Sequence, residues 1–422
     1  MRAAPLIVAL IALVGCSPSS GILGPTPVDV PDGPTPAPEG PAVTEEESPE
    51  GQPDDQGASF FATDRFVQID IELPEASWAA LIEAPYEFTP AHVTIDGRRI
   101  EDIGVRLRGR IGSFRQVWQK PKWRLDFNRY TPGRRVDGLE ALSLDNNVVD
   151  CSGLKQILAW HVMGLADTHA SRGGFAQVTL GGVAYGIYNT VEVQDDRFLA
   201  RRFEDGSGNL YDGAYIWYGD RNYTLMDFTA GIAEQYELEE GVDVGHADTL
   251  GVQYALEEAV ASDDFVGTMD AVFDMETFYR YAAVEHWIGQ NDGYILNTNN
   301  NRVYFDPSDD GRATLISYDL DYAFMPNHWG HNWNNPRGAI AWHCMRDTEC
   351  YEGIRGAVAD LLALLDPAEV EAAFDGWDQL TALPAINDPN SGCNANQIGN
   401  RRGTLRSWIR NRHDVLRAYW NL

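Results

Sequence analysis

The strongest constraint on the fold is a change in hydrophobic periodicity along the chain. The segment 66–73 alternates apolar and polar residues, as a half-buried strand does. The segment 275–288 instead repeats its apolar residues at the spacing of an amphipathic helix. Strand-like segments dominate the first half of the chain and helical segments dominate the second. This distribution predicts an α+β protein with two lobes, the first rich in strands and the second rich in helices.

Turn residues and further periodic segments place the other elements. Asp96-Gly97 and Gly181-Gly182 predict the turns of two hairpins. Further strands are expected at 92–96, 98–100, 103–108, 122–127, 175–180, 185–193, 302–305 and 314–318. Helices are expected at 75–83, 154–165 and 404–420, and the acidic stretch 234–270 is expected to be mostly helical.

The first sixteen residues have the pattern of an export signal. Arg2 precedes a short apolar run at 5–14, which is too short to span a bilayer as a helix. The run ends at Gly15-Cys16, which resembles the lipobox of bacterial lipoproteins. Cys16 is therefore the expected site of lipidation. The alternative is an ordinary signal peptide with an incidental cysteine.

The next segment and the overall charge bear on location and partners. Residues 17–57 are rich in Pro and acidic residues and contain no Lys or Arg, which predicts a disordered tether before a folded domain at 58–422. The formal net charge of −31 disfavours binding to nucleic acid and to anionic membrane surfaces. We therefore expect a monomer in the bacterial cell envelope, held at the outer membrane or cell surface by its lipid alone.

Four cysteines follow Cys16, and an even number in an exported chain is typical of disulfides. Cys344 and Cys350 bracket a short polar loop and are expected to pair. Cys151 would then pair with Cys393. A zinc site is the alternative, although the chain has no CxxC motif and its histidines do not cluster with the cysteines.

The densest group of polar residues lies between Asp292 and Asp321. Asp292 and Asn297 reproduce the spacing between the catalytic Asp and the metal-binding Asn of kinase catalytic loops. Asp319 and Asp321 end a predicted strand, where side chains two residues apart point to the same side and can face one metal ion. The pattern predicts metal-dependent phosphoryl transfer. A calcium site and a capped turn are the alternatives.

Five motifs, in order along the chain, resemble the CotH family, which is named after a spore-coat protein and is related to atypical protein kinases. They are the glycine-containing loop 106–113, the lysine-bearing strand 120–127, the Tyr-Gly strand 185–192 followed by Asp195, the Asn-Asp-Gly-Tyr segment from Asn291, and Tyr318-Asp-Leu-Asp321. The resemblance covers residues 64–420. It implies a bilobal fold like that of atypical protein kinases and an ATP-dependent kinase that phosphorylates Ser or Thr of secreted or surface proteins.

The resemblance also implies a role for each residue. Asp292 would be the catalytic residue, and Mg²⁺ or Mn²⁺ would be held by Asp319 and Asp321 with either Asn297 or Asn300. The expected ATP-binding residues are Arg108, Gly109, Gly112, Lys122 and Glu192, with Lys120 as a rival to Lys122 and with Glu192 orienting the lysine.

Two alternatives to a kinase remain open. The glycine loop reads Arg-Gly-Arg-Ile-Gly-Ser where family members commonly have Gly-Asn-Ser-Ser, and exported compartments contain little ATP. The chain could therefore be a catalytically silent surface protein that serves as a binding or assembly module. Transfer of a different group from a nucleotide, such as AMP, is the third hypothesis.

Overall fold

The computed structural model describes residues 56–422 apart from residues 111, 214, 219–221, 243 and 326–329. The predicted leader, the lipidation site at Cys16 and most of the predicted tether lie outside the described residues. At the end of that tether, the Gly57 amide already donates to the carbonyl of Asp137 at 2.7 Å. Among the described helices, none has the length and apolarity needed to cross a bilayer.

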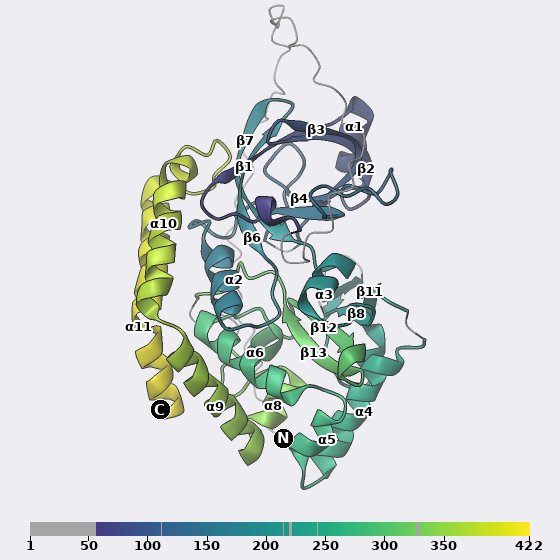
Figure 1. The fold of residues 1–422 in the computed structure, drawn as a ribbon, viewed down its shortest axis with the longest axis vertical. Coiled ribbons are helices and arrows are strands. Elements are labelled where there is room, and N and C mark those ends of the chain that lie inside the picture. The colour runs from purple at the N-terminus through teal and green to yellow at the C-terminus, as the bar shows by residue number, and fades with distance from the viewer. Residues whose placement is uncertain (1–55, 111, 214, 219–221, 243, 326–329) are drawn as a thin grey trace, which may run out of the picture. The chain divides into compact units, whose positions relative to one another are not determined.

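The first part of the described chain forms a closed barrel of seven strands in the order β1-β2-β3-β4-β5-β7-β6 (Figure 1). A parallel pairing of β1 with β6 closes it, and every other neighbouring pair is antiparallel. The strands are β1 (Phe66–Glu72), β2 (Thr89–Ile95), β3 (Arg98–Arg108), β4 (Lys122–Asp126), β5 (Ala141–Asp145), β6 (Gly173–Leu180) and β7 (Val183–Glu192).

Alternation along these strands decides what lies inside the barrel. Val105 and Leu107 of β3 are buried in the barrel core together with Trp123 and Leu125 of β4. Because successive side chains of a strand point to opposite faces, the charged residues between them lie on the outer face. The outer face of β3 and β4 is therefore positively charged, and it forms one wall of the site described below.

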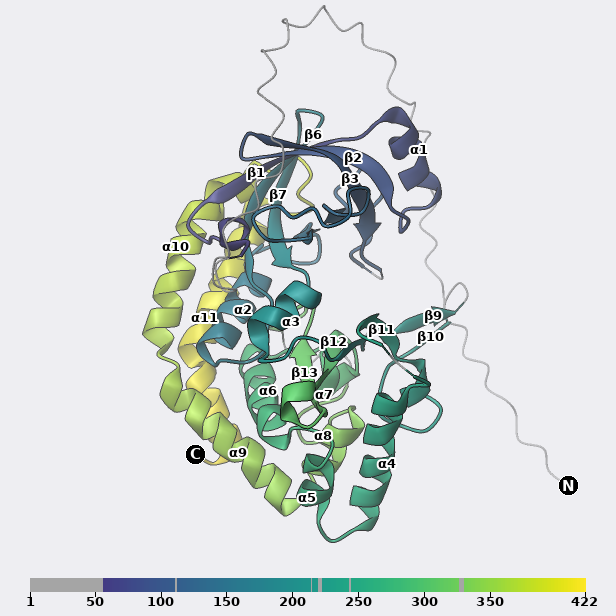
Figure 2. The same ribbon diagram turned by 45° about the vertical axis from the view of Figure 1, so that its right-hand side comes forward.

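A second, antiparallel sheet of four strands has the order β11-β8-β12-β13. Figure 2 shows it beside the barrel, next to the helices. Its strands are β8 (Asn209–Asp212), β11 (Glu237–Glu240), β12 (Asn301–Asp306) and β13 (Arg312–Ser317). Asn301 pairs with Ser317. The residues just before β12 and just after β13 therefore meet at one edge of this sheet.

Helices occur along the whole described chain: the first contacts β2 of the barrel, and most of the others follow β7. They are α1 (Glu75–Glu83), α2 (Lys155–Leu165), α3 (Asp196–Arg202), α4 (Ala247–Ala261), α5 (Phe265–Asp270), α6 (Met275–Ile288), α7 (Tyr294–Asn297), α8 (Ala339–Cys344), α9 (Thr348–Leu364), α10 (Pro367–Ile386) and α11 (Ala395–Trp420). Short elements complete the described chain: η2 (Ala58–Phe60), β9 (Ile216–Tyr218), β10 (Asn222–Thr224), η3 (Ala233–Gln235) and η4 (Pro307–Asp309). Helix α6 packs against α9, α2 and β13, and their apolar side chains form the larger of the cores.

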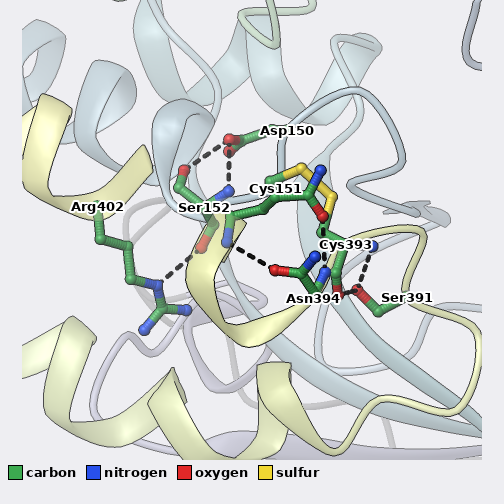
Figure 3. Close-up of a disulfide and its surroundings, with 8 residues drawn as sticks. Asp150, Cys151, Ser152, Ser391, Cys393, Asn394 and Arg402 are labelled. Atoms are coloured by element: carbon green, nitrogen blue, oxygen red, sulfur yellow. Dashed lines mark hydrogen bonds between the residues drawn. A yellow bond between two sulfur atoms is a disulfide. The ribbon is translucent and has the colours of Figure 1, made fainter. Parts of the chain in front are cut away.

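The two C-terminal helices are fastened to the barrel. Figures 1 and 2 show α10 and α11 side by side, reaching from α9 to β7. In the loop between them, Cys393 forms a disulfide with Cys151, and Asp388 forms a buried ion pair with Lys120, with 2.6 Å between Nζ and Oδ2 (Figure 3 shows the disulfide). The other disulfide, Cys344–Cys350, closes a short loop. Both predicted disulfides are confirmed.

The prediction of a bilobal, kinase-like fold is wrong, although the α+β class is right. The first half is rich in strands as expected, but the parallel β1–β6 pairing closes all seven strands into a barrel and not a kinase-like lobe. The second half is rich in helices and contains the expected β12–β13 hairpin, but that hairpin is part of a four-stranded sheet. The acidic stretch 234–270 contains α4 and α5 as expected, but it also contributes β11 to that sheet.

Candidate functional site

A cleft of about 340 Å³ lies between the outer face of β3 and β4 and the edge of the second sheet where β12 begins and β13 ends. Its lining is charged on both sides. Arginines line it from the barrel strands, and acidic and amide residues line it from the loops around the second sheet; the main ones are Arg106, Arg108, Arg124, Asp292, Asn300 and Asp319. Leu107 is the only aliphatic residue in the described lining.

Lys122 lies at the centre of three carboxylates. Its Nζ is 2.6 Å from Oδ2 of Asp145 and 3.2 Å from Oδ2 of both Asp319 and Asp321. Lys122 is the first residue of β4, and Asp145 is the last residue of the neighbouring strand β5. Asp319 and Asp321 lie just after β13. The ion pairs therefore join the barrel to the second sheet.

The charges of this cluster do not balance. Burial and the nearby Asp319 raise the pKa of Asp321 well above its ordinary value. Burial acts against ionisation of Asp145 as well, but the Lys122 ammonium outweighs it and lowers the pKa of that carboxyl. The three carboxylates together raise the pKa of Lys122 well above its ordinary value, against the effect of burial. One lysine is thus shared among three acidic groups.

This cluster fits a divalent metal ion. Carboxylate oxygens of Asp145, Asp319 and Asp321 all lie within 4.8 Å of one another. Oδ1 of Asp319 is buried and has no hydrogen-bond partner in the described structure. An all-oxygen set of this kind suits Mg²⁺ or Mn²⁺. A cation would supply the positive charge that Lys122 alone cannot.

Asp292 is held by three side-chain amides. Asn297 and Asn299 donate to its Oδ1 at 2.6 and 3.1 Å, and Asn300 donates to its Oδ2 at 3.0 Å. Burial raises the pKa of Asp292 to about 6, with the amide hydrogen bonds opposing that rise and Asp319 adding to it. The carboxylate is therefore fixed in orientation and poised near neutral pH, as an acceptor of a hydroxyl proton must be.

The two candidate asparagines differ in position. Asn300 lines the cleft, and besides Asp292 its Nδ2 reaches the backbone carbonyl of Asp319 at 3.2 Å. Asn297 contacts Asp292 and also accepts from Arg337 at 3.3 Å, but it does not line the cleft. Asn300 is therefore the asparagine that lies beside the Asp319 segment of the carboxylate cluster.

The two candidate lysines are also distinguished. The buried ion pair with Asp388 directs Lys120 to the C-terminal helices. Lys122 points into the acidic cluster of the cleft. Pro121 between them breaks the alternation that would have placed both lysines on one face of the strand.

The arginine and the glycines of the predicted phosphate loop lie at the cleft. Arg108 lines it and stacks over the ring of Tyr318, 5.7 Å from the centroid. Gly109 also lines it, at a φ of 94° that an L side chain rarely adopts. A Cβ on Gly109 would lie 2.9 Å from Oγ of Ser113, and one on Gly112 would lie 3.5 Å from Oη of Tyr322. Both glycines thus lie close to residues that line the cleft.

Glu192 has other partners than the one expected. Arg172 and Arg201 hold its carboxylate at 2.7 and 2.6 Å. It does not line the cleft, and Lys122 is oriented by Asp145 instead. The structure therefore does not support Glu192 as the residue that orients the lysine.

Sequence reasoning missed Asp145 and Asn299. Asp145 ends an alternating strand and precedes two asparagines, which is a weak signal for an acidic strand end. Asn299 lies between Asn297 and Asn300 in the sequence, and its side chain is buried. It donates to Asp292, and its Oδ1 accepts from the backbone amide of Tyr215 at 3.1 Å. The Asn-rich loop is thus a cradle of amides and not a single metal-binding asparagine.

The site thus combines a charged cleft, an oriented carboxylate, a cluster of three carboxylates and a buried lysine. A family model described as "CotH kinase protein" matches residues 105–416. The chain therefore belongs to the CotH family.

Among curated proteins, the chain is similar to the invasin CotH3 of Rhizopus delemar. The two are 23% identical over 181 residues, which is 40% of this chain and 28% of that protein. The match thus spans well under two thirds of the invasin.

Proposed function

We propose that the chain is an exported, lipid-anchored protein kinase that transfers the γ-phosphoryl group of ATP to Ser or Thr of proteins in the envelope or at the cell surface. The lipid would be carried by Cys16. The single observation that carries the proposal is that Asp292, Asp319 and Asp321 line one cleft, where Asn300 bonds both to the Asp292 carboxylate and to the backbone carbonyl of Asp319. Membership of a family described as kinases supports it.

The residues divide into two roles. Asp292, fixed by its three amides, orients the acceptor hydroxyl and accepts its proton. Asp319 and Asp321, with Asn300 beside them, would hold Mg²⁺ or Mn²⁺, and the bound metal would neutralise charge on the phosphates. Lys122 and Arg108 supply the remaining positive charge, and the backbone at Gly109 lies close enough to the cleft to approach a phosphate.

The test is phosphate transfer from radiolabelled ATP to envelope proteins in the presence of Mg²⁺ or Mn²⁺. Asp292→Asn and Asp319→Asn should each lower labelling by roughly a thousandfold. Asp310→Asn is the matched control, because Asp310 is exposed in the turn between β12 and β13. Equal labelling by the wild type and all three variants would contradict the proposal.

One observation favours the second candidate, a catalytically silent binding module. Lys122 already lies among the carboxylates that a metal would need. A silent module predicts no thermal shift with ATP and Mg²⁺, and full function of the Asp292→Asn strain. A kinase predicts the opposite result in both measurements.

A further inference from the structure

A second group of positive charges lies in the same cleft. Arg106 and Arg124 are direct cross-strand partners on β3 and β4, and Arg302 projects from β12. All three line the cavity. Like charges directly opposite each other in a sheet repel and destabilise it. Such a group therefore calls for an anion, although the chain as a whole is strongly acidic.

The guanidinium groups are only partly hydrogen-bonded: Nη1 of Arg302 donates to the carbonyl of Gln194 at 3.0 Å, and Nη1 of Arg106 donates to that of Tyr86 at 3.5 Å. The Nε atoms of Arg106, Arg124 and Arg302 are buried without a hydrogen-bond acceptor in the described structure. The Arg124 side chain has no hydrogen bond and no ion pair within 4.0 Å among the described residues, although its backbone pairs in the sheet. Burial, with the neighbouring Arg108 and Arg106, lowers its pKa to about 9. Buried guanidinium donors of this kind match the oxygens of a phosphate group.

Several acidic residues lie near this group: Asp195 acts on Arg124, Glu87 acts on Arg106, and two carboxylates lie beside Arg302. Oε2 of Glu239 lies 3.6 Å from Nη1 of Arg302, and Oδ2 of Asp212 lies 4.0 Å from its Nη2. Arg302 lowers the pKa of Glu239 against the effect of burial, and Arg124 and Arg106 contribute. The carboxylate of Glu239 thus lies within the field of all three arginines.

Glu239 is placed so that it can be displaced. Its side chain remains 38% exposed. It belongs to β11, the edge strand of its sheet, where the register with β8 shifts between Leu238 and Glu240. Because this side chain is partly exposed on an edge strand, its carboxylate can rotate away from Arg302 toward solvent without moving the backbone.

We propose that Arg106, Arg124 and Arg302 form a second anion site that binds a phosphate group, and that Glu239 is the internal carboxylate which this group displaces. The inference rests on the proposed function, since the site shares the cleft with Asp292. The phosphate belongs either to the nucleotide or to a phosphorylated residue of the acceptor protein, and the experiment separates these two sources.

The first experiment titrates inorganic phosphate into the full chain by isothermal calorimetry, without metal or nucleotide and at constant ionic strength. Arg124→Gln should weaken binding about tenfold, because it removes a charged donor. Glu239→Gln should tighten binding several-fold, a gain that misfolding cannot produce. Arg410→Gln is the control, since Arg410 is exposed and pairs with Glu371. No phosphate binding by the wild type, or equal affinity in the wild type, Arg124→Gln and Glu239→Gln, would overturn the proposal.

The second experiment compares ADP with a phosphoserine peptide and its unphosphorylated form. If Arg124→Gln lowers the affinity for ADP alone by tenfold, the phosphate belongs to the nucleotide. If it lowers the affinity for the phosphopeptide alone, the phosphate belongs to the acceptor protein. Unchanged affinity for both refutes the site. A protein that binds phosphate in this way but transfers none contradicts only the proposed kinase function. A protein that transfers phosphate, but whose affinity for phosphate is unchanged by Arg124→Gln and Glu239→Gln, contradicts only this inference.

Discussion

Lys122 and Asp145 form a buried ion pair with 2.6 Å between Nζ and Oδ2, at the point where the barrel meets the second sheet. The same ammonium also contacts Asp319 and Asp321. Lys122 therefore carries the positive charge that holds three carboxylates together. A divalent cation bound at the same place would also neutralise these carboxylates. The response of a Lys122 variant to added metal therefore tests the metal site directly.

Replacing Lys122 should make the fold depend on metal. Lys122→Met leaves three carboxylates facing one another, which should lower the free energy of unfolding by on the order of 3 kcal/mol without metal. Millimolar MgCl₂ should then stabilise the variant more than it stabilises the wild type. Urea unfolding with and without MgCl₂ measures both effects.

Arg410→Met is the control for this experiment, because it removes a cation that is exposed and does not line the cleft. It should change neither stability nor the response to MgCl₂ by a measurable amount. If Lys122→Met responds to MgCl₂ no more than this control does, the three carboxylates do not form a metal site.

Lys120 is predicted to be structural. Its side chain and that of Asp388 are 6% and 1% exposed. Lys120→Met should therefore destabilise the protein by roughly 3 kcal/mol, because it leaves a buried carboxylate unpaired. The double variant Lys120→Met/Asp388→Asn should lose less than the sum of the two single variants in urea unfolding. The response to MgCl₂ should stay as in the wild type, and a loss of that response in Lys120→Met would assign Lys120 to the cleft instead.

The parts of this site that local sequence pattern could predict are those held by neighbouring residues. Asp292, Asn300, Asp319 and Asp321 lie around one hairpin, β12–β13, and the pairing of Asn301 with Ser317 brings them to one edge. Asp145 was not predictable in the same way. It reaches Lys122 only because β4 pairs with β5 inside a closed barrel, and no local pattern specifies that closure.

The same distinction explains the error in the fold. The hairpin turns at Asp96-Gly97 and Gly181-Gly182 are local, and both hairpins form as expected. The β1–β6 pairing joins strands about a hundred residues apart in the sequence, and it closes the expected strand-rich lobe into a barrel. Strand β11 lies in a Glu-rich stretch that favours a helix, but pairing with β8 overrides that preference.

The two disulfides should contribute unequally to stability. Cys151 and Cys393 are 242 residues apart, and Cys344 and Cys350 are 6 residues apart. Chain entropy in the unfolded state predicts a loss of about 5 kcal/mol for Cys151→Ser/Cys393→Ser and about 2 kcal/mol for Cys344→Ser/Cys350→Ser. Urea unfolding of both double variants measures this difference. Equal losses would show that strain or residual structure in the unfolded chain outweighs the length of the loop.

Glu285 is a buried acidic residue that contacts the segment carrying Asp292. It is fully buried in α6, and Oγ of Ser317 donates to its Oε1 at 3.4 Å. A Cβ on Gly293 would lie 2.4 Å from the same oxygen, which leaves no room for a side chain there. Burial raises the pKa of Glu285 to about 8; the nearby hydroxyls of Tyr281 and Ser317 oppose the rise, and Asp292 adds to it.

The free energy of unfolding should consequently decrease as the pH rises, because Glu285 loses its proton. The folded state keeps the Glu285 proton up to a pKa of about 8, whereas the unfolded chain releases it near the ordinary value of 4.5. The stabilising contribution is therefore complete below about pH 4.5 and is lost as the pH rises to about 8. Glu285→Gln should remove this dependence and exceed the wild type in stability at about pH 8, by on the order of a few kcal/mol. Glu276→Gln, an exposed position on the same helix, is the control in urea unfolding across this range. If the wild type, Glu285→Gln and Glu276→Gln share one pH dependence, Glu285 does not hold a proton in the folded state.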